Sequence, residues 1–150
     1  MSAPLHHASG AFFGRAHHFP VRVNFEDTDM TGVVYHPNYL NYMERARSDA
    51  LRLLDIDYRA AFERGEGYFA IAELAIKYLK PAQLGDALII VSQIQVLRAV
   101  SWLVHQRVMR NDDVIADATI TLAFLSSDGR PKRQPKAWAE AYQIMLKEPA

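Results

Sequence analysis

The stretch from Phe25 to Tyr39, FEDTDMTGVVYHPNY, decides how this sequence is interpreted. It places three carboxylates, those of Glu26, Asp27 and Asp29, just before a segment with helical spacing. A helix N-terminus presents unpaired backbone N–H groups and a partial positive charge. A carboxylate beside it is placed to act as a base or nucleophile on an electrophile that those amides hold. The stretch therefore predicts a polar helix cap, a metal site or a catalytic loop.

Composition narrows the classes of protein. The chain has 150 residues, half of them apolar, which predicts one domain with a real core. Seventeen Lys and Arg balance seventeen Asp and Glu, so an anionic ligand must be met by a local patch. The absence of cysteine excludes disulfides, thiolate zinc sites and a cysteine nucleophile. No apolar run approaches the roughly 20 residues of a membrane span, so we expect a soluble, cytoplasmic protein.

The flanks of the acidic run predict a strand before it and a long helix after it. Apolar and polar residues alternate over 21–25, as in a half-buried strand. The helix is expected from about Pro37 to Leu54, with proline at its first position. Small residues in the middle of its apolar stripe suit a helix cradled by a sheet. The predicted stripe is Tyr39, Met43, Ala46, Ala50 and Leu53.

The rest of the chain predicts an α+β domain. Residues 1–18 lack periodicity and are expected to form a flexible, solvated leader before a single domain of residues 19–150. A short helix over 58–64 and a C-terminal helix from Pro135 flank four strand-like segments. Strands joined by short turns predict a five-stranded antiparallel sheet with the long helix on one face. The four segments are 72–78, 88–98, 102–110 and 114–125.

One interpretation of the run is a phosphatase of the haloacid-dehalogenase type. Residues 27–31, DTDMT, fit the D-x-D-x-T pattern, which could hold Mg²⁺. That motif requires a buried parallel strand before it, which would be continuously apolar. Arg22, Asn24 and Glu26 interrupt this strand, and no alternation of strands and helices follows. The flanks therefore disfavour the metal site.

A second interpretation rests on a longer pattern, V-R-V-N-F-E-D-T-D-M-T-G-V-V-Y-H-P-N-Y-L-N-Y-M-E-R-A-R over residues 21–47. It closely resembles the hotdog-fold acyl-CoA thioesterases of the 4-hydroxybenzoyl-CoA thioesterase superfamily, particularly the bacterial branch associated with the Tol-Pal system. The resemblance extends to about Pro135 and implies a curved sheet wrapped around one long helix. It also implies homodimers or homotetramers with active sites between subunits, and no cofactor, since coenzyme A is part of the substrate. Envelope or lipid-synthesis proteins are the partners it suggests.

The resemblance assigns site residues within the run. The catalytic carboxylate falls on Asp29 and a second catalytic position on His36, with the backbone amides of Tyr35 and His36 polarising the thioester carbonyl. Gly32 and Val33 are expected to contact substrate. Relatives often have tyrosine where this chain has Phe25, which leaves a hydroxyl out.

Other parts of the chain supply further candidates. Arg130, Lys132 and Arg133 are expected to meet the coenzyme A phosphates, with Arg98 and Ser101 as further contacts; the alternative is a solvated basic loop. Several aromatic residues either line an acyl pocket or pack the core: Tyr35, Tyr39, Tyr42, Phe69 and Tyr78.

Three alternatives stay open at this stage. Glu44, on the long helix, is either an acid as in other hotdog branches or a partner for Arg47 at i,i+3 spacing. Asp27 shares a face with Asp29 if the backbone is extended, and would then influence its pKa. The chain is an acyl-CoA thioesterase, a non-catalytic acyl-CoA binding module, or a hotdog dehydratase or hydratase.

Overall fold

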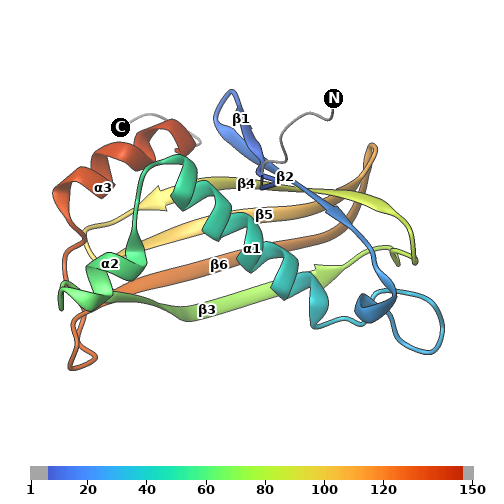
Figure 1. Ribbon diagram of the computed structural model, residues 1–150, viewed down its shortest axis with the longest axis horizontal. Helices are drawn as coiled ribbons and strands as arrows, with labels where there is room; N and C mark the ends of the chain where they lie inside the picture. The colour runs from blue at the N-terminus through green and yellow to red at the C-terminus, as the bar shows by residue number, and fades with distance from the viewer. Residues whose placement is uncertain (1–6, 147–150) are drawn as a thin grey trace, which may run out of the picture.

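The fold is a curved antiparallel sheet that wraps around one helix, seen in a computed structural model that describes residues 7–146 (Figure 1). The described residues form a six-stranded sheet in the order β1-β2-β4-β5-β6-β3. Its strands are β1 (Ala11–Phe13), β2 (Ala16–Arg22), β3 (Tyr68–Tyr78), β4 (Ala87–Leu97), β5 (Ser101–Arg110) and β6 (Asp113–Leu125). The helices are η1 (Phe25–Asp27), α1 (Asn38–Leu53), α2 (Tyr58–Glu63), α3 (Lys136–Ala141) and η2 (Tyr142–Met145).

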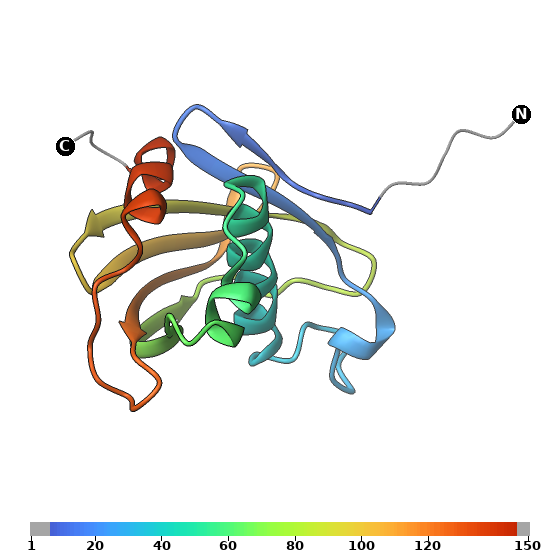
Figure 2. The same cartoon turned by 60° about the vertical axis from the view of Figure 1, so that its left-hand side comes forward.

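The core lies between α1 and the concave face of the sheet. Figure 2 shows α1 running across the hollow of the sheet, with α3 at one side. Met43, Ala46 and Ala50 on α1 are at most 2% exposed and face fully buried residues such as Val104 and Ile120. Small side chains let the sheet close around the helix, because bulkier ones would hold the two layers apart. The predicted α+β hotdog architecture is therefore confirmed.

The prediction for the C-terminal end of the apolar stripe on the long helix is wrong. Leu53 is 40% exposed, whereas Leu51 is 6% exposed and belongs to the core. Leu53 is the last residue of α1. The chain turns away from the sheet here, and Ile56 in the following loop supplies the buried side chain.

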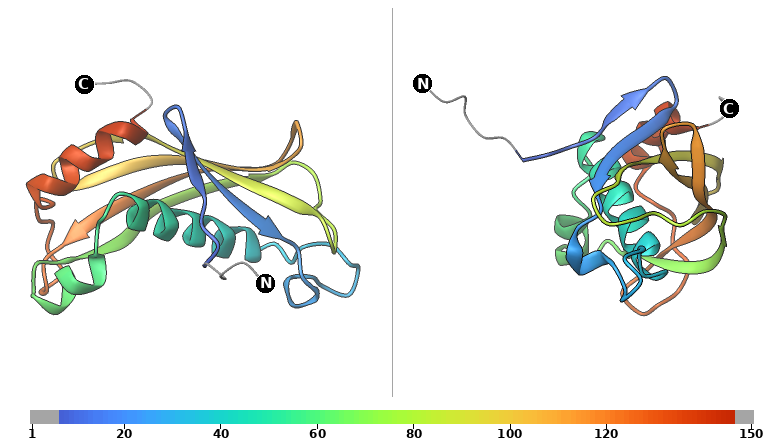
Figure 3. Two further views of the ribbon diagram at one scale, coloured as in Figure 1. Left: turned by 45° about the horizontal axis from the view of Figure 1, so that its top comes forward. Right: turned by 90° about the vertical axis from the view of Figure 1, so that its right-hand side faces the viewer.

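The predicted leader departs most from expectation. Residues 11–13 and 16–22 pair as the hairpin of β1 and β2, which adds a sixth strand to the five that were expected (Figure 3). His17, expected in solvent, is fully buried, and its Nε2 lies 2.7 Å from Asp49 Oδ2 on α1. Asp49 also accepts hydrogen bonds from Ser9 and the Gly10 amide. These contacts hold the hairpin on the domain; residues 1–6 lie outside the described part of the chain.

Candidate functional site

The acidic run folds into a closed loop between η1 and α1. Thr28 and Val34 form an antiparallel bridge, and the Asp29 amide donates to the Val33 carbonyl at 3.0 Å. The Gly32 amide donates to the Asp29 carbonyl at 3.1 Å. Gly32 has a φ of +81°, a conformation that glycine adopts without steric cost. The two ends of the loop are thereby fixed, and Asp29 is held near its tip.

The Asp29 carboxylate is exposed and held by Thr31. Its Oδ1 accepts from the Thr31 hydroxyl at 2.5 Å and from the Thr31 amide at 2.8 Å. These hydrogen bonds, the hydroxyl's first, hold the pKa of Asp29 below its ordinary value, because they stabilise the charged form. Among residues 7–146, Oδ2 has no hydrogen-bond donor. An oriented, ionised carboxylate therefore has one oxygen ready to accept a proton.

Asp27 has a different position from the one expected. The backbone is not extended here, since residues 25–27 form the single turn η1. Asp27 is 6% exposed, and its carboxylate accepts from the Asn24 amide at 2.8 Å. The pKa of Asp29 is shifted by Thr31 and not by Asp27. Asp27 thus caps the turn, while the Phe25 side chain beside it is 83% exposed.

The start of α1 leaves one of the two predicted amides available. The Tyr35 amide donates to the Asp27 carbonyl at 2.9 Å, so it is already used within the fold. The His36 amide, by contrast, has no acceptor within the described part of the chain. The His36 ring is exposed and lies edge-on to Tyr78, with ring centroids 6.0 Å apart. The Tyr78 hydroxyl donates to the His36 carbonyl at 3.4 Å.

The residues predicted for coenzyme A phosphates gather at the other end of the protomer. Arg98 and Ser101 close the turn between β4 and β5, and the Gln134 amide reaches the neighbouring Ala99 carbonyl at 3.2 Å. Lys132 donates from Nζ to the Glu66 carbonyl at 2.6 Å. Arg130 and Arg133 are exposed in the same loop, residues 126–135 between β6 and α3, which we call the basic loop.

The structure therefore splits the predicted site into two groups. Tyr78, at one end of β3, lies beside His36, while Tyr68, at the other end, pairs with Leu125, just before the basic loop. β3 has 11 residues, which at about 3.3 Å per residue separates the two groups by roughly 33 Å. Within one protomer, Asp29 and the basic loop are thus far apart.

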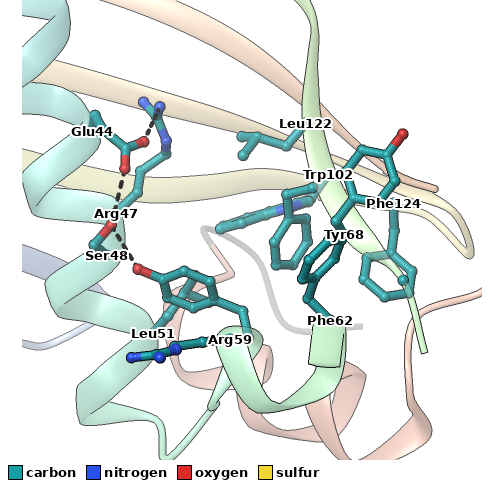
Figure 4. A pocket seen from close by; sticks show the side chains of 13 residues that line it. Glu44, Arg47, Ser48, Leu51, Arg59, Phe62, Tyr68, Trp102, Leu122 and Phe124 are labelled. Atoms are coloured by element: carbon teal, nitrogen blue, oxygen red, sulfur yellow. Dashed lines mark hydrogen bonds and ion pairs between the residues drawn. The ribbon is translucent and has the colours of Figure 1, made fainter. Parts of the chain in front are cut away.

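A pocket of about 330 Å³ lies at the same end of the protomer as the basic loop (Figure 4). Glu44 lies on its α1 side, paired with Arg47 at 3.1 Å as expected from their spacing. Arg47 also donates to the buried Gln106 at 2.8 Å, which ties this wall to the core. The other lining residues are Ser48, Leu51, Tyr58, Arg59, Phe62, Gly67, Tyr68, Phe69, Trp102, Leu122 and Phe124.

Most of these pocket residues escaped the sequence interpretation. They come from two helices and three strands, and only the folded sheet brings them together. Of the aromatic candidates, Phe69 lines this pocket, while Tyr39 and Tyr42 are core residues at 4% and 1% exposure. Tyr35 and Tyr78 are about half exposed, at 51% and 46%. In the sequence, a feature that points to this pocket is Ser48, a small residue in the middle of the helix and four positions after Glu44.

Comparison with known proteins decides the family. Residues 23–143 match the model of the thioesterase-like superfamily. The chain belongs to this superfamily. It is 40% identical over 105 residues to the acyl-CoA thioesterase YbgC of Haemophilus influenzae, covering 70% of this chain and 77% of that protein. It is 35% identical over 121 residues to the acyl-CoA thioester hydrolase YbgC of Escherichia coli O6:H1, covering 79% and 90%.

A solved structure supports the same assignment. The crystal structure of a probable thioesterase from Bartonella henselae has a TM-score of 0.75 and 30% identity, covering 80% of this chain and 99% of that one. The family match begins at residue 23, so the β1–β2 hairpin of this thioesterase-like protein lies before it. Within residues 7–146, no three His, Asp or Glu side chains gather as metal ligands would. No helix in that range is both long and apolar enough to cross a membrane.

Proposed function

We propose that this protein hydrolyses the thioester bond of acyl-coenzyme A, with Asp29 as the base or the nucleophile. The observation that carries the proposal is the exposed Asp29 carboxylate, oriented by Thr31 in a loop that leads into α1. Its lowered pKa keeps it ionised at neutral pH. Membership of the thioesterase-like superfamily and the names of its YbgC relatives support the same reaction.

The reaction requires an attacking oxygen and a place for the oxyanion. As a base, Asp29 takes a proton from water while the water oxygen bonds to the carbonyl carbon. The carbonyl oxygen becomes an oxyanion, which the free His36 amide and the positive end of α1 stabilise. The carbon–sulfur bond then breaks and coenzyme A leaves as its thiolate, which takes up a proton. A thiol has a pKa of ~8.5, so the coenzyme A thiolate can leave with little help from an acid. The reaction needs no metal or cofactor.

The β3 edge supports a homodimer as the working unit. β3 is the outer strand of the sheet and carries exposed apolar side chains, including Ile71 at 48% and Leu74 at 41%. An open apolar edge invites pairing with another strand. Pairing with β3 of a second copy about a two-fold axis would make the strands antiparallel. The Tyr78 end of one subunit would then lie beside the Tyr68 end of its partner.

This arrangement would unite the two halves of the predicted site. Asp29 and His36 of one subunit would lie next to the pocket and the basic loop that the other subunit contributes. Arg130, Lys132 and Arg133 would then be placed for the phosphates of coenzyme A, for which cations are the natural partners. A tetramer would repeat this pair of sites. We place the activity in the cytoplasm, and partners from the envelope or lipid synthesis stay a prediction from the family resemblance.

A thiol-release assay tests the proposed activity. Purified protein is assayed with acetyl-, benzoyl-, octanoyl- and hexadecanoyl-CoA, and Asp29→Asn is compared with the exposed control Asp112→Asn. We expect hydrolysis of at least one thioester, lost by a factor of about 10² or more in Asp29→Asn and retained in Asp112→Asn. Equal activity of Asp29→Asn and wild type would overturn the mechanism. Tight binding of acyl-CoA without hydrolysis would favour a binding module.

A further inference from the structure

The N-terminal hairpin of β1 and β2 connects two parts of the domain that are far apart in the sequence. One attachment is to α1, where the Asp49 carboxylate is bonded to Ser9, to the Gly10 amide and to His17. The other attachment is to the C-terminal segment of α3 and η2. Figures 1 and 2 show the turn between β1 and β2 beside the end of this segment.

The C-terminal segment needs support from outside itself. α3 has six residues and η2 has four. Helices this short are marginal on their own, because each turn that is ordered gains few hydrogen bonds. Packing supplies part of the support, since Tyr142 is fully buried and Met145 is 2% exposed. The carbonyls at the end of a helix have no partner within it, so they need donors from elsewhere.

Arg15, in the turn between β1 and β2, supplies that donor. Its Nη1 donates to the Gln143 carbonyl at 3.0 Å and to the Leu146 carbonyl at 3.2 Å. A cation at this place also meets the partial negative charge of the last carbonyls of a helix. The backbone of Arg15 is itself held, because the Gln93 side chain on β4 donates to its carbonyl at 3.3 Å. The guanidinium therefore reaches the end of η2 from a turn that is tied to the sheet.

The segment that Arg15 holds carries the rings behind the pocket. Trp138 on α3 lies against Phe69 and Phe124, with ring centroids 5.8 Å and 5.5 Å apart. Tyr142 on η2 stacks on Trp102 at 5.1 Å and 15°. Phe69, Trp102 and Phe124 line the pocket, and the rings of the C-terminal segment stand behind them. Close-packed side chains transmit a displacement to their neighbours, so a shift of this segment would change the aromatic wall of the pocket.

The hairpin is thereby linked to both sides of the pocket. α1 forms one side, and the same helix carries Asp49, the anchor of the hairpin. The rings held by the C-terminal segment form the other side. Leu146 also makes a parallel bridge with Ile94 of β4, the strand that pairs with β2. The separation of the two sides is therefore fixed by a continuous set of contacts from α1 through the hairpin to η2.

We infer that Arg15 is a positioning residue, which holds the C-terminal segment against the rings behind the pocket and so keeps the pocket in shape for substrate. The inference rests on the proposed function, which places this pocket beside Asp29 of the partner subunit. Arg15 acts through Trp138 and Tyr142 and not through the Asp29 loop. Its loss should therefore weaken substrate binding and spare the chemical step, which raises KM and leaves kcat nearly unchanged.

Tryptophan fluorescence reports on the C-terminal segment directly. The chain has two tryptophans, Trp102 and Trp138, and both belong to this ring packing. Acrylamide quenching would be compared in wild type, Arg15→Ala, Arg15→Lys and the matched control Arg22→Ala. Arg22 is an exposed arginine of the same hairpin that also donates to a backbone carbonyl, that of Gly85 at 2.9 Å. We expect the quenching constant to rise about twofold or more in Arg15→Ala, less in Arg15→Lys and not at all in Arg22→Ala.

Steady-state kinetics measure the consequence for the pocket. With an acyl-CoA that wild type hydrolyses, Arg15→Ala should raise KM about threefold or more and keep kcat within about twofold. Arg15→Lys should recover part of the loss, because lysine keeps the charge and one donor but lacks the planar fork. Urea unfolding checks that each variant is folded under the assay conditions. A residue that only added stability would lower the free energy of unfolding and change neither quenching nor KM.

The two readouts separate this inference from the proposed function. If wild type hydrolyses acyl-CoA, an unchanged KM in Arg15→Ala would overturn the positioning role and leave the activity standing. An equal rise in quenching in Arg22→Ala would overturn the specific role of Arg15. A rise in quenching confined to Arg15→Ala, with no hydrolysis by wild type, would overturn the proposed function and keep the hold of Arg15 on the C-terminal segment. Unchanged quenching together with no hydrolysis would overturn both.

Discussion

At the scale of single residues, Asp29 and Asp49 show how surroundings assign different roles to the same side chain. Asp29 is exposed and has hydrogen bonds from one neighbour, Thr31. Asp49 is 1% exposed and accepts from three groups, those of Ser9, Gly10 and His17. The exposed carboxylate is available to react, and the buried one joins α1 to the N-terminal hairpin.

The first prediction concerns the pH dependence of hydrolysis. Asp29 is active when ionised, and Thr31 holds its pKa below the ordinary value of ~3.9. The acid limb of the pH profile of kcat/KM should therefore lie below about pH 4. The assays must be short enough to finish before the protein unfolds in acid. Thr31→Val removes the hydroxyl bond, raises this pKa and moves the acid limb to higher pH. An acid limb unmoved in Thr31→Val would contradict the role given to Thr31.

A second prediction concerns stability and His17. Burial lowers the pKa of His17, an effect that outweighs its hydrogen bond with Asp49. The unfolded chain therefore binds a proton at His17 more readily than the folded chain does. Stability should be fully present above the unfolded pKa of ~6.5 and should decline as pH falls below it.

Asp49 is expected to act in a lower pH range. Burial raises its pKa, but hydrogen bonds from Ser9, Gly10 and His17 outweigh this and lower it overall, so its contribution disappears only in stronger acid. Urea unfolding between pH 8 and 5 measures the His17 contribution, with His17→Phe as the variant that removes it. If the free energy of unfolding changes with pH by the same amount in wild type and in His17→Phe over this range, His17 is not the cause of the pH dependence.

At the scale of elements, α1 and the N-terminal hairpin show where sequence patterns succeed and fail. The long strands and α1 were predictable because alternation and helical spacing recur over ten or more residues. The hairpin was missed because β1 has only three residues and β2 carries two consecutive histidines, His17 and His18, near its start. Its stability depends on His17 and Asp49, which are 32 positions apart. No local pattern reports such a contact.

The same reasoning applies to the site. The Asp29 loop lies in one continuous motif, so the sequence located it. The Tyr35 amide is occupied by a single hydrogen bond to the Asp27 carbonyl, whereas the His36 amide has no acceptor in residues 7–146, and composition does not encode this difference. The pocket depends on three strands and two helices meeting, and it was therefore beyond reach before the fold was known.

The small stripe on α1 leads to a third prediction. Ala46 is fully buried against the sheet, so Ala46→Leu should overpack the core and lower the free energy of unfolding by about 1–3 kcal/mol. The exposed control Asn41→Leu on the same helix should change it by about 0.5 kcal/mol or less. Urea denaturation of both variants measures the difference. Equal stability of the two would contradict the close packing of sheet and helix.

At the scale of the whole molecule, the two ends of the protomer carry complementary halves of one site. The Asp29 loop lies at the Tyr78 end of β3 and the pocket at the Tyr68 end. A fourth prediction follows from the exposed apolar edge between them. Leu74→Lys places a charge at the centre of β3, and it should shift the protein toward monomer in size-exclusion chromatography and abolish hydrolysis. A monomeric variant with full activity would show that one protomer suffices.

Mixing two inactive variants tests the composite site most directly. One subunit carries Asp29→Asn, and the other carries Arg130→Ala, Lys132→Ala and Arg133→Ala together. If each site takes Asp29 from one subunit and the basic loop from the other, a mixed dimer has one intact site. After unfolding and refolding together at equal amounts, half of the dimers are mixed, so about a quarter of the wild-type kcat/KM should return. Activity no greater than the average of the two parent variants would contradict a site shared between subunits.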